Sequence, residues 1–290
     1  MVCLAATAAP AKRCTETAGS RPRICICIFR RIHRQQRSCF CREKPFTTEY
    51  AAFLKSKIIR NVFLRVLRVL RGEKEFNKMS RFTDPEIAAV YKAIAERRDV
   101  RHFLPDPLEP ELMQRLLHAA HLAPSVGFMQ PWRFIRITDR ALRNAIHALV
   151  EQERIATAHV MHEREDEFMR LKVEGIRECG EVLVAALMDR REEHIFGRRT
   201  LPEMDLASVA CAIQNIWLAA RAEGIGMGWV SMFDPEKLGA LLRIPAGGKP
   251  VAILCLGKVE GFYLKPMLEM EGWAERQDLA GLVFENGWSE

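Results

Sequence analysis

Apolar residues recur at helical spacing in several stretches of the chain after residue 79. Ile87, Val90, Tyr91 and Ile94 fall at positions i, i+3, i+4 and i+7, directly after Asp84-Pro85-Glu86. A capping side chain, a proline and an acid in this order are typical of a helix start. The same signals predict helices at 110–121, 142–150, 205–224 and from 235 onwards, with Asp84, Asp205 and Asp234 as capping residues.

Short apolar runs between these helices predict strands at 132–137, 182–188, 228–232 and 250–256. The run at 182–188 is continuously apolar, which is typical of a strand buried on both faces. Because helices and strands intermix, one α/β or α+β domain is predicted. Three further segments are interpreted separately: charge-rich 151–178 as a solvated helix face or a lid, 189–204 as a basic loop, and 258–290 as an aromatic tail that packs on this domain or on a second subunit.

Charge divides the chain near residue 78. Of the 44 Lys and Arg and the 37 Asp and Glu, 18 and 5 fall in residues 1–78, which leaves 26 and 32 for the remainder. The overall charge of +7 therefore belongs to the first part, and the acidic remainder argues against nonspecific nucleic-acid binding by the core. No apolar run is long enough to span a bilayer, so no membrane partner is expected for the core domain.

Residues 1–78 are predicted to be a basic, disordered N-terminal extension, separate from a domain at 79–290. Its segment 55–71 has a basic amphipathic pattern, which is typical of a membrane-surface or targeting helix. The favoured interpretation is instead that the native chain starts at Met79. The three cysteines of the second part, Cys179, Cys211 and Cys255, lie in apolar contexts, which is typical of thiols in a reducing compartment and predicts a cytoplasmic protein.

The segment Arg97-Arg98-Asp99-Val100-Arg101 places three guanidinium groups and one carboxylate where the first predicted helix ends. Guanidinium forks match phosphate oxygens, although cations in a last helical turn can also simply complement the helix dipole. Two other stretches favour a binding site. The loop from Pro124 to Trp132 and the run Gly228-Trp229-Val230-Ser231 combine small residues with hydroxyl groups, and can approach a flat ring closely.

Two other patterns are interpreted as structural. Gly224-Ile225-Gly226-Met227-Gly228 follows a predicted helix and precedes a strand, which is the reverse of the order that a dinucleotide-binding loop needs. The pairs His118/His121 and His159/His162 lack a third ligand at convincing spacing, so no metal site is expected.

At the three stretches singled out for binding, the chain resembles the FMN-dependent nitroreductase superfamily and, more closely, the 5,6-dimethylbenzimidazole synthase family. The resemblance covers roughly residues 84–288. Nitroreductases tend to have Ser where Asp99 stands and Asn where Phe128 stands, whereas Asp99 and the run ending in Ser231 are similar to the synthases. The resemblance implies an α+β fold of three layers (α/β/α), with a mixed sheet flanked by helices. It also implies a homodimer in which the C-terminal tail packs on the partner subunit.

The resemblance further implies that FMN is bound at the dimer interface. The arginines of the 97–101 segment and Arg276 would hold the phosphate and the ring edge, and the 124–127 loop would contact the flavin of the partner subunit. The implied cofactor-binding residues are Arg97, Arg98, Asp99, Val100, Arg101, Pro124, Ser125, Val126, Gly127, Val230, Ser231 and Arg276.

A synthase of this family uses reduced FMN (FMNH2) as its substrate and O2 as co-substrate. The implied products are 5,6-dimethylbenzimidazole, the lower ligand of cobalamin, and erythrose 4-phosphate, and a separate flavin reductase would supply FMNH2. Asp99 is then the expected catalytic base, kept ionised by its arginine neighbours, and Ser231 would orient the flavin by hydrogen bonding. Three alternatives stay open: Asp99 as a mere ion-pair partner, an NAD(P)H-dependent flavin reductase or nitroreductase that returns its FMN, and a noncatalytic flavin-binding module.

Overall fold

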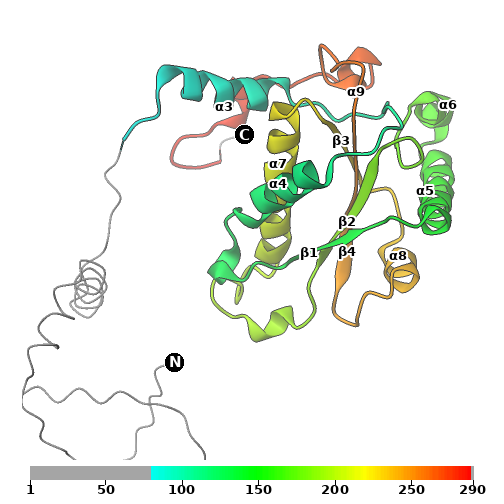
Figure 1. The fold of residues 1–290 in the computed structure, drawn as a ribbon, viewed down its shortest axis with the longest axis horizontal. Helices are drawn as coiled ribbons and strands as arrows, with labels where there is room; N and C mark the ends of the chain where they lie inside the picture. Colours follow the sequence, from blue (N-terminus) through cyan, green and yellow to red (C-terminus); the bar gives the residue numbers. More distant parts are fainter. Residues whose placement is uncertain (1–79, 289–290) are drawn as a thin grey trace, which may run out of the picture. The chain divides into compact units, whose positions relative to one another are not determined.

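The structure is a computed structural model that describes residues 80–288 (Figure 1). The expectations for residues 1–78, including the basic segment at 55–71 and a native start at Met79, lie outside this range. Within the described range, no helix is both long enough and apolar enough to cross a membrane.

A four-stranded sheet forms the centre of the domain, in the order β1-β2-β4-β3. Every pair of neighbouring strands is antiparallel. Asp99 adds a single parallel bridge to Met227 of β3, and the sheet is mixed at that point. All residues of β2 are buried, as its continuously apolar sequence predicted. The strands are β1 (Trp132–Arg136), β2 (Glu181–Leu187), β3 (Gly226–Val230) and β4 (Lys249–Gly257).

Helices cover both faces of this sheet, which confirms the predicted three layers. Helices α4 (Pro110–His121) and α7 (Met204–Ala222) lie on one face, and α5 (Arg140–Val160) and α8 (Pro235–Leu241) lie on the other (Figure 1). Successive residues of a strand point to opposite faces. Leu183 of β2 therefore packs against α4 and α7, whereas Val182 and Val184 pack on the side of α5 and α8.

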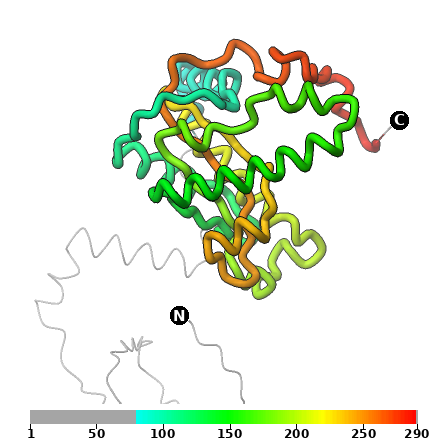
Figure 2. Tube along the Cα trace, turned by 90° about the vertical axis from the view of Figure 1, so that its right-hand side faces the viewer, coloured from blue at the N-terminus to red at the C-terminus, as the bar shows by residue number. Residues whose placement is uncertain are grey.

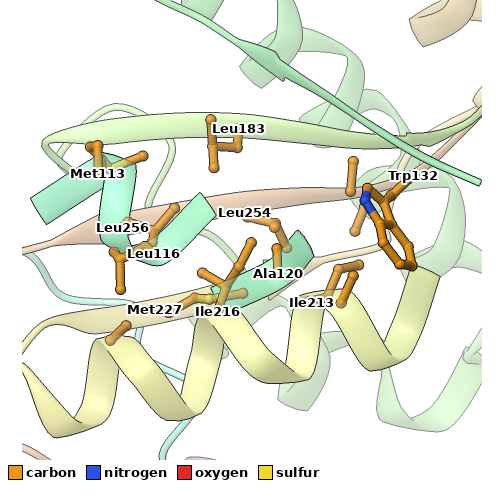
Figure 3. Close-up of a cluster of buried hydrophobic side chains, with 14 of the residues drawn as sticks. Met113, Leu116, Ala120, Trp132, Leu183, Ile213, Ile216, Met227, Leu254 and Leu256 are labelled. Atoms are coloured by element: carbon orange, nitrogen blue, oxygen red, sulfur yellow. The ribbon is translucent and has the colours of Figure 1, made fainter. Parts of the chain in front are cut away.

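The larger core lies between the sheet and the pair α4–α7. Figure 3 shows side chains of both helices meeting the strands, and Ile213, Ile216 and Leu254 in this cluster are fully buried. The contact depends on α4 and α7 presenting apolar faces at the spacing that the sequence predicted. This core fixes α7 firmly against the sheet.

Helix α3 (Asp84–Glu96) begins and ends close to its predicted bounds, but its capping residue is Thr83 rather than Asp84. The backbone N–H of Thr83 donates to the Glu86 carboxylate at 2.8 Å, which is one half of a capping box. The apolar face of α3 is not inside this subunit, since 68% of the surface of Tyr91 is exposed and Val90 and Ile94 are exposed too. An exposed apolar face of this kind is typical of a contact with a second subunit.

Asp205 has a different role from the predicted one. Helix α7 starts at Met204, and Asp205 lies in its first turn as a buried carboxylate. Its Oδ2 accepts from Arg191 at 2.8 Å and from Arg198 at 3.1 Å. The predicted cap is therefore wrong, because two arginines of the basic 189–204 loop neutralise the acid and hold that loop on the helix. This loop also contains a short turn, η3 (Arg191–Glu193).

The charge-rich segment 151–178 is helical only in part. Helix α5 continues to Val160 and is followed by η2 (His162–Arg164) and α6 (Glu165–Arg170), after which the chain is extended at Leu171. The tail forms α9 (Met267–Met270) and η4 (Leu279–Leu282) and runs over the top of the domain (Figure 2). Trp273 packs on Phe168, with ring centroids 6.2 Å apart, whereas 88% of the Trp288 surface is exposed. Only the first part of the tail thus packs on its own subunit.

Candidate active site

Two adjoining pockets meet at Asp99, and Met267 and Leu268 also line both. The first, of about 170 Å³, is basic and is called the arginine pocket here. The second, of about 270 Å³, is mainly apolar and is called the apolar pocket. The arginine pocket is lined by Ile94, Ala95, Arg97, Arg98, Asp99, Pro266, Met267, Leu268 and Arg276. The apolar pocket is lined by Asp99, Arg101, Met161, Phe168, Leu171, Val173, Trp229, Val230, Ser231, Met232, Met267, Leu268 and Trp273.

The Arg97–Arg101 segment reaches both pockets because it leaves α3 and runs alongside β3. Arg97 has extended dihedral angles, φ −59° and ψ 133°, which end the helix. The N–H of Val100 then donates to the carbonyl of Met227 at 2.9 Å. Gly228 permits this close approach, because a Cβ at that position would lie 2.3 Å from the carbonyl oxygen of Val100. The predicted Gly228–Ser231 run and the arginine segment are therefore brought together.

Asp99 is held by two donors. Its Oδ1 accepts from the backbone N–H of Trp229 at 3.0 Å, and its Oδ2 accepts from Nη2 of Arg101 at 2.5 Å. Burial raises the pKa of the Asp99 carboxyl and outweighs the opposing effects of Arg101, the Trp229 N–H and Arg97. The arginines do favour the ionised form, as expected, but the net direction is upward. A carboxyl with a raised pKa but 40% of its side chain exposed is suited to proton transfer.

Arg101 lies at the apolar pocket, away from the other arginines. Only 9% of its side chain is exposed, and its Nη2 also donates to the carbonyl of Trp229 at 3.0 Å. Its Nε and Nη1 are buried and have no hydrogen-bond partner within residues 80–288. Arg101 therefore fixes the Asp99 carboxylate against β3. Its predicted contacts with the phosphate and with the ring edge stay predictions.

In the arginine pocket, the side chains of Arg97 and Arg276 are the ones available to a ligand. In the described part of the chain, neither side chain makes a hydrogen bond or an ion pair, and Arg97 instead lies over the Trp217 ring, with its Cζ 4.4 Å from the ring centroid. Burial lowers the pKa of the Arg97 guanidinium; nearby Asp99 opposes this, whereas the positive charges of Arg98 and Arg276 add to it. The pocket thus has an excess of positive charge that an anionic group would neutralise.

Arg98 is mostly occupied by the protein backbone. Its Nε and Nη2 donate at 2.9 Å to the carbonyls of Tyr263 and Leu264, and its Nη1 donates to the carbonyls of Ala95 and Arg97. Four of the five N–H groups of the guanidinium are therefore used. Arg98 closes the end of α3 and attaches the start of the tail, although it still lines the arginine pocket.

The apolar pocket is walled by the predicted lid and by the tail. Met161, Phe168, Leu171 and Val173 come from the 151–178 segment, and Trp273 comes from the tail. The Cζ of Arg164 lies 3.6 Å from the centroid of the Trp273 ring, which attaches this segment to the tail. These are the side chains that a lid over an apolar ligand would use, and the lid itself stays a prediction.

Val230 and Ser231 lie where β3 ends at the apolar pocket. The Val230 side chain is buried in the core on the α5–α8 side, so Val230 is available to a ligand mainly through its backbone. Ser231 is exposed and lines the pocket. Of these two predicted residues, Ser231 is the one whose side chain can reach a bound molecule.

The 124–127 loop is not brought to this site within one subunit. It precedes β1, at the opposite edge of the sheet from β3, and three strand spacings amount to about 14 Å. Val126 N–H donates to Ser208 Oγ at 3.0 Å, near the start of α7. The backbone carbonyl of Arg98 instead accepts from the Nε1–H of Trp217, further along the same helix. Pro124, Ser125, Val126 and Gly127 line neither of the two pockets. A second subunit would have to supply them.

Several contributors to the site were not predicted from the sequence. Met267 and Leu268 belong to α9, a helix of four residues that was not predicted from the sequence. They line both pockets with Asp99 because the tail folds back over the site. The Trp229 N–H could not be predicted as the donor to Asp99 without knowing that the two segments are neighbours. Trp217 was detectable as an aromatic residue within a predicted helix, but its contact with Arg97 was not.

Comparisons with known proteins identify the family of this chain. A model of the nitroreductase family matches residues 94–258. The 5,6-dimethylbenzimidazole synthase of Rhodospirillum rubrum is 44% identical over 62% of this chain and 87% of its own length. A 5,6-dimethylbenzimidazole synthase of Rhodobacter capsulatus is 38% identical over 64% of this chain and 91% of its own length.

Among solved structures, an oxidised iodotyrosine deiodinase bound to FMN and 3-iodo-L-tyrosine has a similar fold. Its TM-score is 0.54 at 20% identity, over 69% of this chain and 100% of that one. The fold, the match over residues 94–258 and the identity to the two synthases lead to one conclusion. This chain belongs to the nitroreductase family and, within it, to the family of the 5,6-dimethylbenzimidazole synthases.

Proposed function

We propose that this protein is a 5,6-dimethylbenzimidazole synthase, which converts FMNH2 and O2 into 5,6-dimethylbenzimidazole and erythrose 4-phosphate, while the pyrimidine ring of the flavin leaves as a third, oxidised product. The product would serve as the lower ligand of cobalamin. The observation that carries the proposal is the position of Asp99, a carboxylate with a raised pKa at the junction of a cationic and an apolar pocket. The 44% identity to a synthase supports it.

The two pockets suit the two ends of FMN. A phosphate at one end of the molecule matches the uncompensated guanidinium groups of Arg97 and Arg276. A flat ring at the other end matches the apolar pocket, whose walls include Phe168, Trp229 and Trp273. The sugar chain between the two ends would then pass Asp99. This arrangement supports FMN as the ligand of the site.

Reduced FMN supplies the electrons for the reaction with O2 and the carbon atoms of the product. In our proposal, Asp99 accepts and returns protons at the sugar chain and at the neighbouring edge of the ring, and Arg101 holds its carboxylate in place. Ser231 provides a hydrogen bond to the ring. The side chains of the 151–178 segment exclude water from the apolar pocket.

The proposed active unit is a homodimer. The 124–127 loop of one subunit would complete the site of the other, since it lies at the opposite edge of its own sheet. The exposed apolar face of α3 and the exposed end of the tail, including Trp288, offer surface for this contact. Because the reaction consumes its flavin, the proposal also includes a separate flavin reductase as the source of FMNH2.

The proposal is tested by adding chemically reduced FMN to the protein in air. We expect less flavin to be recovered after complete reoxidation than was added, and 5,6-dimethylbenzimidazole to appear in an amount equal to that loss, as measured by chromatography with mass detection. A flavin reductase or nitroreductase would instead oxidise NAD(P)H and return its FMN unchanged, and a binding module would do neither. Recovery of all the flavin without product would reject the synthase proposal.

A further inference from the structure

Trp217 lies on α7 directly behind the candidate active site. Its indole is half-buried and is not among the residues that line the two pockets in the described part of the chain. A ligand in those pockets would therefore not touch it, and any influence on the site would pass through its neighbours. Those neighbours are the residues on which the proposed function depends.

Trp217 makes three contacts with the site. The guanidinium of Arg97 lies over its ring, with Cζ 4.4 Å from the ring centroid. Its Nε1–H donates to the carbonyl of Arg98 at 3.0 Å. Its ring centroid lies 6.3 Å from that of Trp229, whose backbone N–H binds Asp99. One side chain thus contacts a residue of the arginine pocket and both backbone segments that position the carboxylate.

The contact with Arg97 matters because the Arg97 guanidinium makes no hydrogen bond or ion pair with residues 80–288. An arginine side chain has many rotamers, and ordering it on a ligand costs conformational free energy. A guanidinium stacked on an aromatic face is already restricted to one plane, while its N–H edges stay open to a phosphate. The Trp217 ring therefore prepares Arg97 for an anionic ligand.

The position of Trp217 is itself well fixed. The neighbouring residues Ile213, Ile216 and Ala220 of α7 are fully buried in the core beneath the sheet. One turn further along, Arg221 forms an ion pair with Glu96 at the end of α3. A side chain on so firmly packed a helix can serve as a rigid support for a binding site.

We propose that Trp217 is a positioning residue that aligns Arg97 for the phosphate of the flavin substrate and supports the backbone around Asp99. This inference rests on the proposed function, because it assumes that the arginine pocket binds the FMN phosphate. Its effect is expected in the selectivity for FMN over riboflavin, which has the same ring and sugar chain but no phosphate.

The test compares the dissociation constants of oxidised FMN and riboflavin by fluorescence titration of the full chain. Trp217→Leu removes the aromatic face and the N–H, and should lower the ratio of FMN affinity to riboflavin affinity roughly five- to tenfold. Trp217→Phe keeps an aromatic face and should retain most of that ratio. Riboflavin affinity should change little in either variant. A Trp217→Leu protein with the wild-type ratio would overturn the inference.

Arg97→Gln provides the background that separates positioning from general damage. If Trp217 acts through Arg97, then Trp217→Leu should not change the FMN-to-riboflavin ratio further in the Arg97→Gln protein. A further decrease of the ratio in that background, or an equal loss of FMN and riboflavin affinity in the single variant, would contradict the inference. Phe134→Leu is a matched control, since the Phe134 side chain is a half-buried aromatic group that packs against the same core from β1, at the other edge of the sheet. It should lower thermal stability but leave the ratio unchanged.

The outcomes also separate this inference from the proposed function. If the wild-type protein bound FMN and riboflavin equally, the assignment of the arginine pocket to the phosphate would fail, and the role of Trp217 would fail with it. If the wild-type protein preferred FMN but the variants did too, only the role of Trp217 would be rejected.

Discussion

The arginine pocket and the apolar pocket share Asp99, Met267 and Leu268 but differ in the charge and polarity of their other lining residues. The first has three arginines and lacks any acid other than Asp99 among its lining residues, whereas the second is walled by methionine, aliphatic and aromatic side chains. A ligand that fills both must be strongly anionic at one end and flat and apolar at the other. Asp99 lies where these two environments meet: Arg101 at the apolar pocket orients its carboxylate, and the charge of Arg97 at the arginine pocket favours its ionised form.

One short extended segment serves both pockets because its side chains alternate in direction. Arg97, Asp99 and Arg101 belong to one side and reach the arginine pocket, the junction and the apolar pocket in turn. Val100, on the other side, is buried beside β3. The extended backbone separates these three side chains along the segment, which is why their environments differ although they are close in sequence.

Asp99→Asn should have the largest effect, because it removes the proposed proton-transfer group but keeps the shape of the junction. We expect product formation from FMNH2 and O2 to fall by about 10³-fold. Affinity for oxidised FMN should change by less than about fivefold, since both pockets remain intact. The measurements are the rate of 5,6-dimethylbenzimidazole formation and the FMN dissociation constant. Product at the wild-type rate would show that Asp99 only pairs with Arg101.

Arg276→Gln should affect only the arginine pocket. The loss of one charge-assisted contact to the phosphate should weaken FMN binding roughly 10- to 100-fold, with riboflavin affinity unchanged. Arg199→Gln removes the same charge from an exposed position outside both pockets and should leave FMN affinity unchanged. Equal losses for FMN and riboflavin in Arg276→Gln would place Arg276 at another part of the ligand.

The pH dependence of the reaction should be the smallest effect, and it tests the electrostatics of the junction. Burial raises the pKa of Asp99, so the base becomes protonated, and the rate falls, at a higher pH than for an ordinary aspartate of pKa about 3.9. The folded protein holds this proton more tightly than the unfolded chain does. The stabilisation from protonated Asp99 is therefore present below the unfolded pKa and is lost as pH rises through the folded pKa.

Rates of product formation between mildly acidic and neutral pH check this prediction. If the rate fell only at the pH at which an unperturbed aspartate becomes protonated, solvent would have free access to Asp99. Thermal melting of Asp99→Asn and the wild type over the same pH range provides the control. The stability of the wild type relative to Asp99→Asn should decrease as pH rises.

Much of the fold could be predicted because its signals are local. Helix α4 has the predicted bounds, Pro110 to His121, since a proline marks its start and Pro124 follows its end. The four strands lie within about two residues of their predicted positions. The predicted cap at Asp205 was wrong because an acid before an apolar run suits both a cap and a buried ion pair. The apolar face of α3 was predicted correctly, but no local signal could tell that it is exposed in one subunit.

The sequence by itself determined which residues could form the site: a cluster of three arginines with one carboxylate, and two stretches of small residues with hydroxyl groups. Only the tertiary structure decided that the arginine segment lies against β3, that burial outweighs the arginines in setting the pKa of Asp99, and that the 124–127 loop lies at the opposite edge of the sheet. The physical reason is the range of the interactions. Caps, prolines and apolar periodicity act within a few residues, whereas desolvation and the contact between Trp217 and Arg97 depend on residues more than a hundred positions apart in the chain.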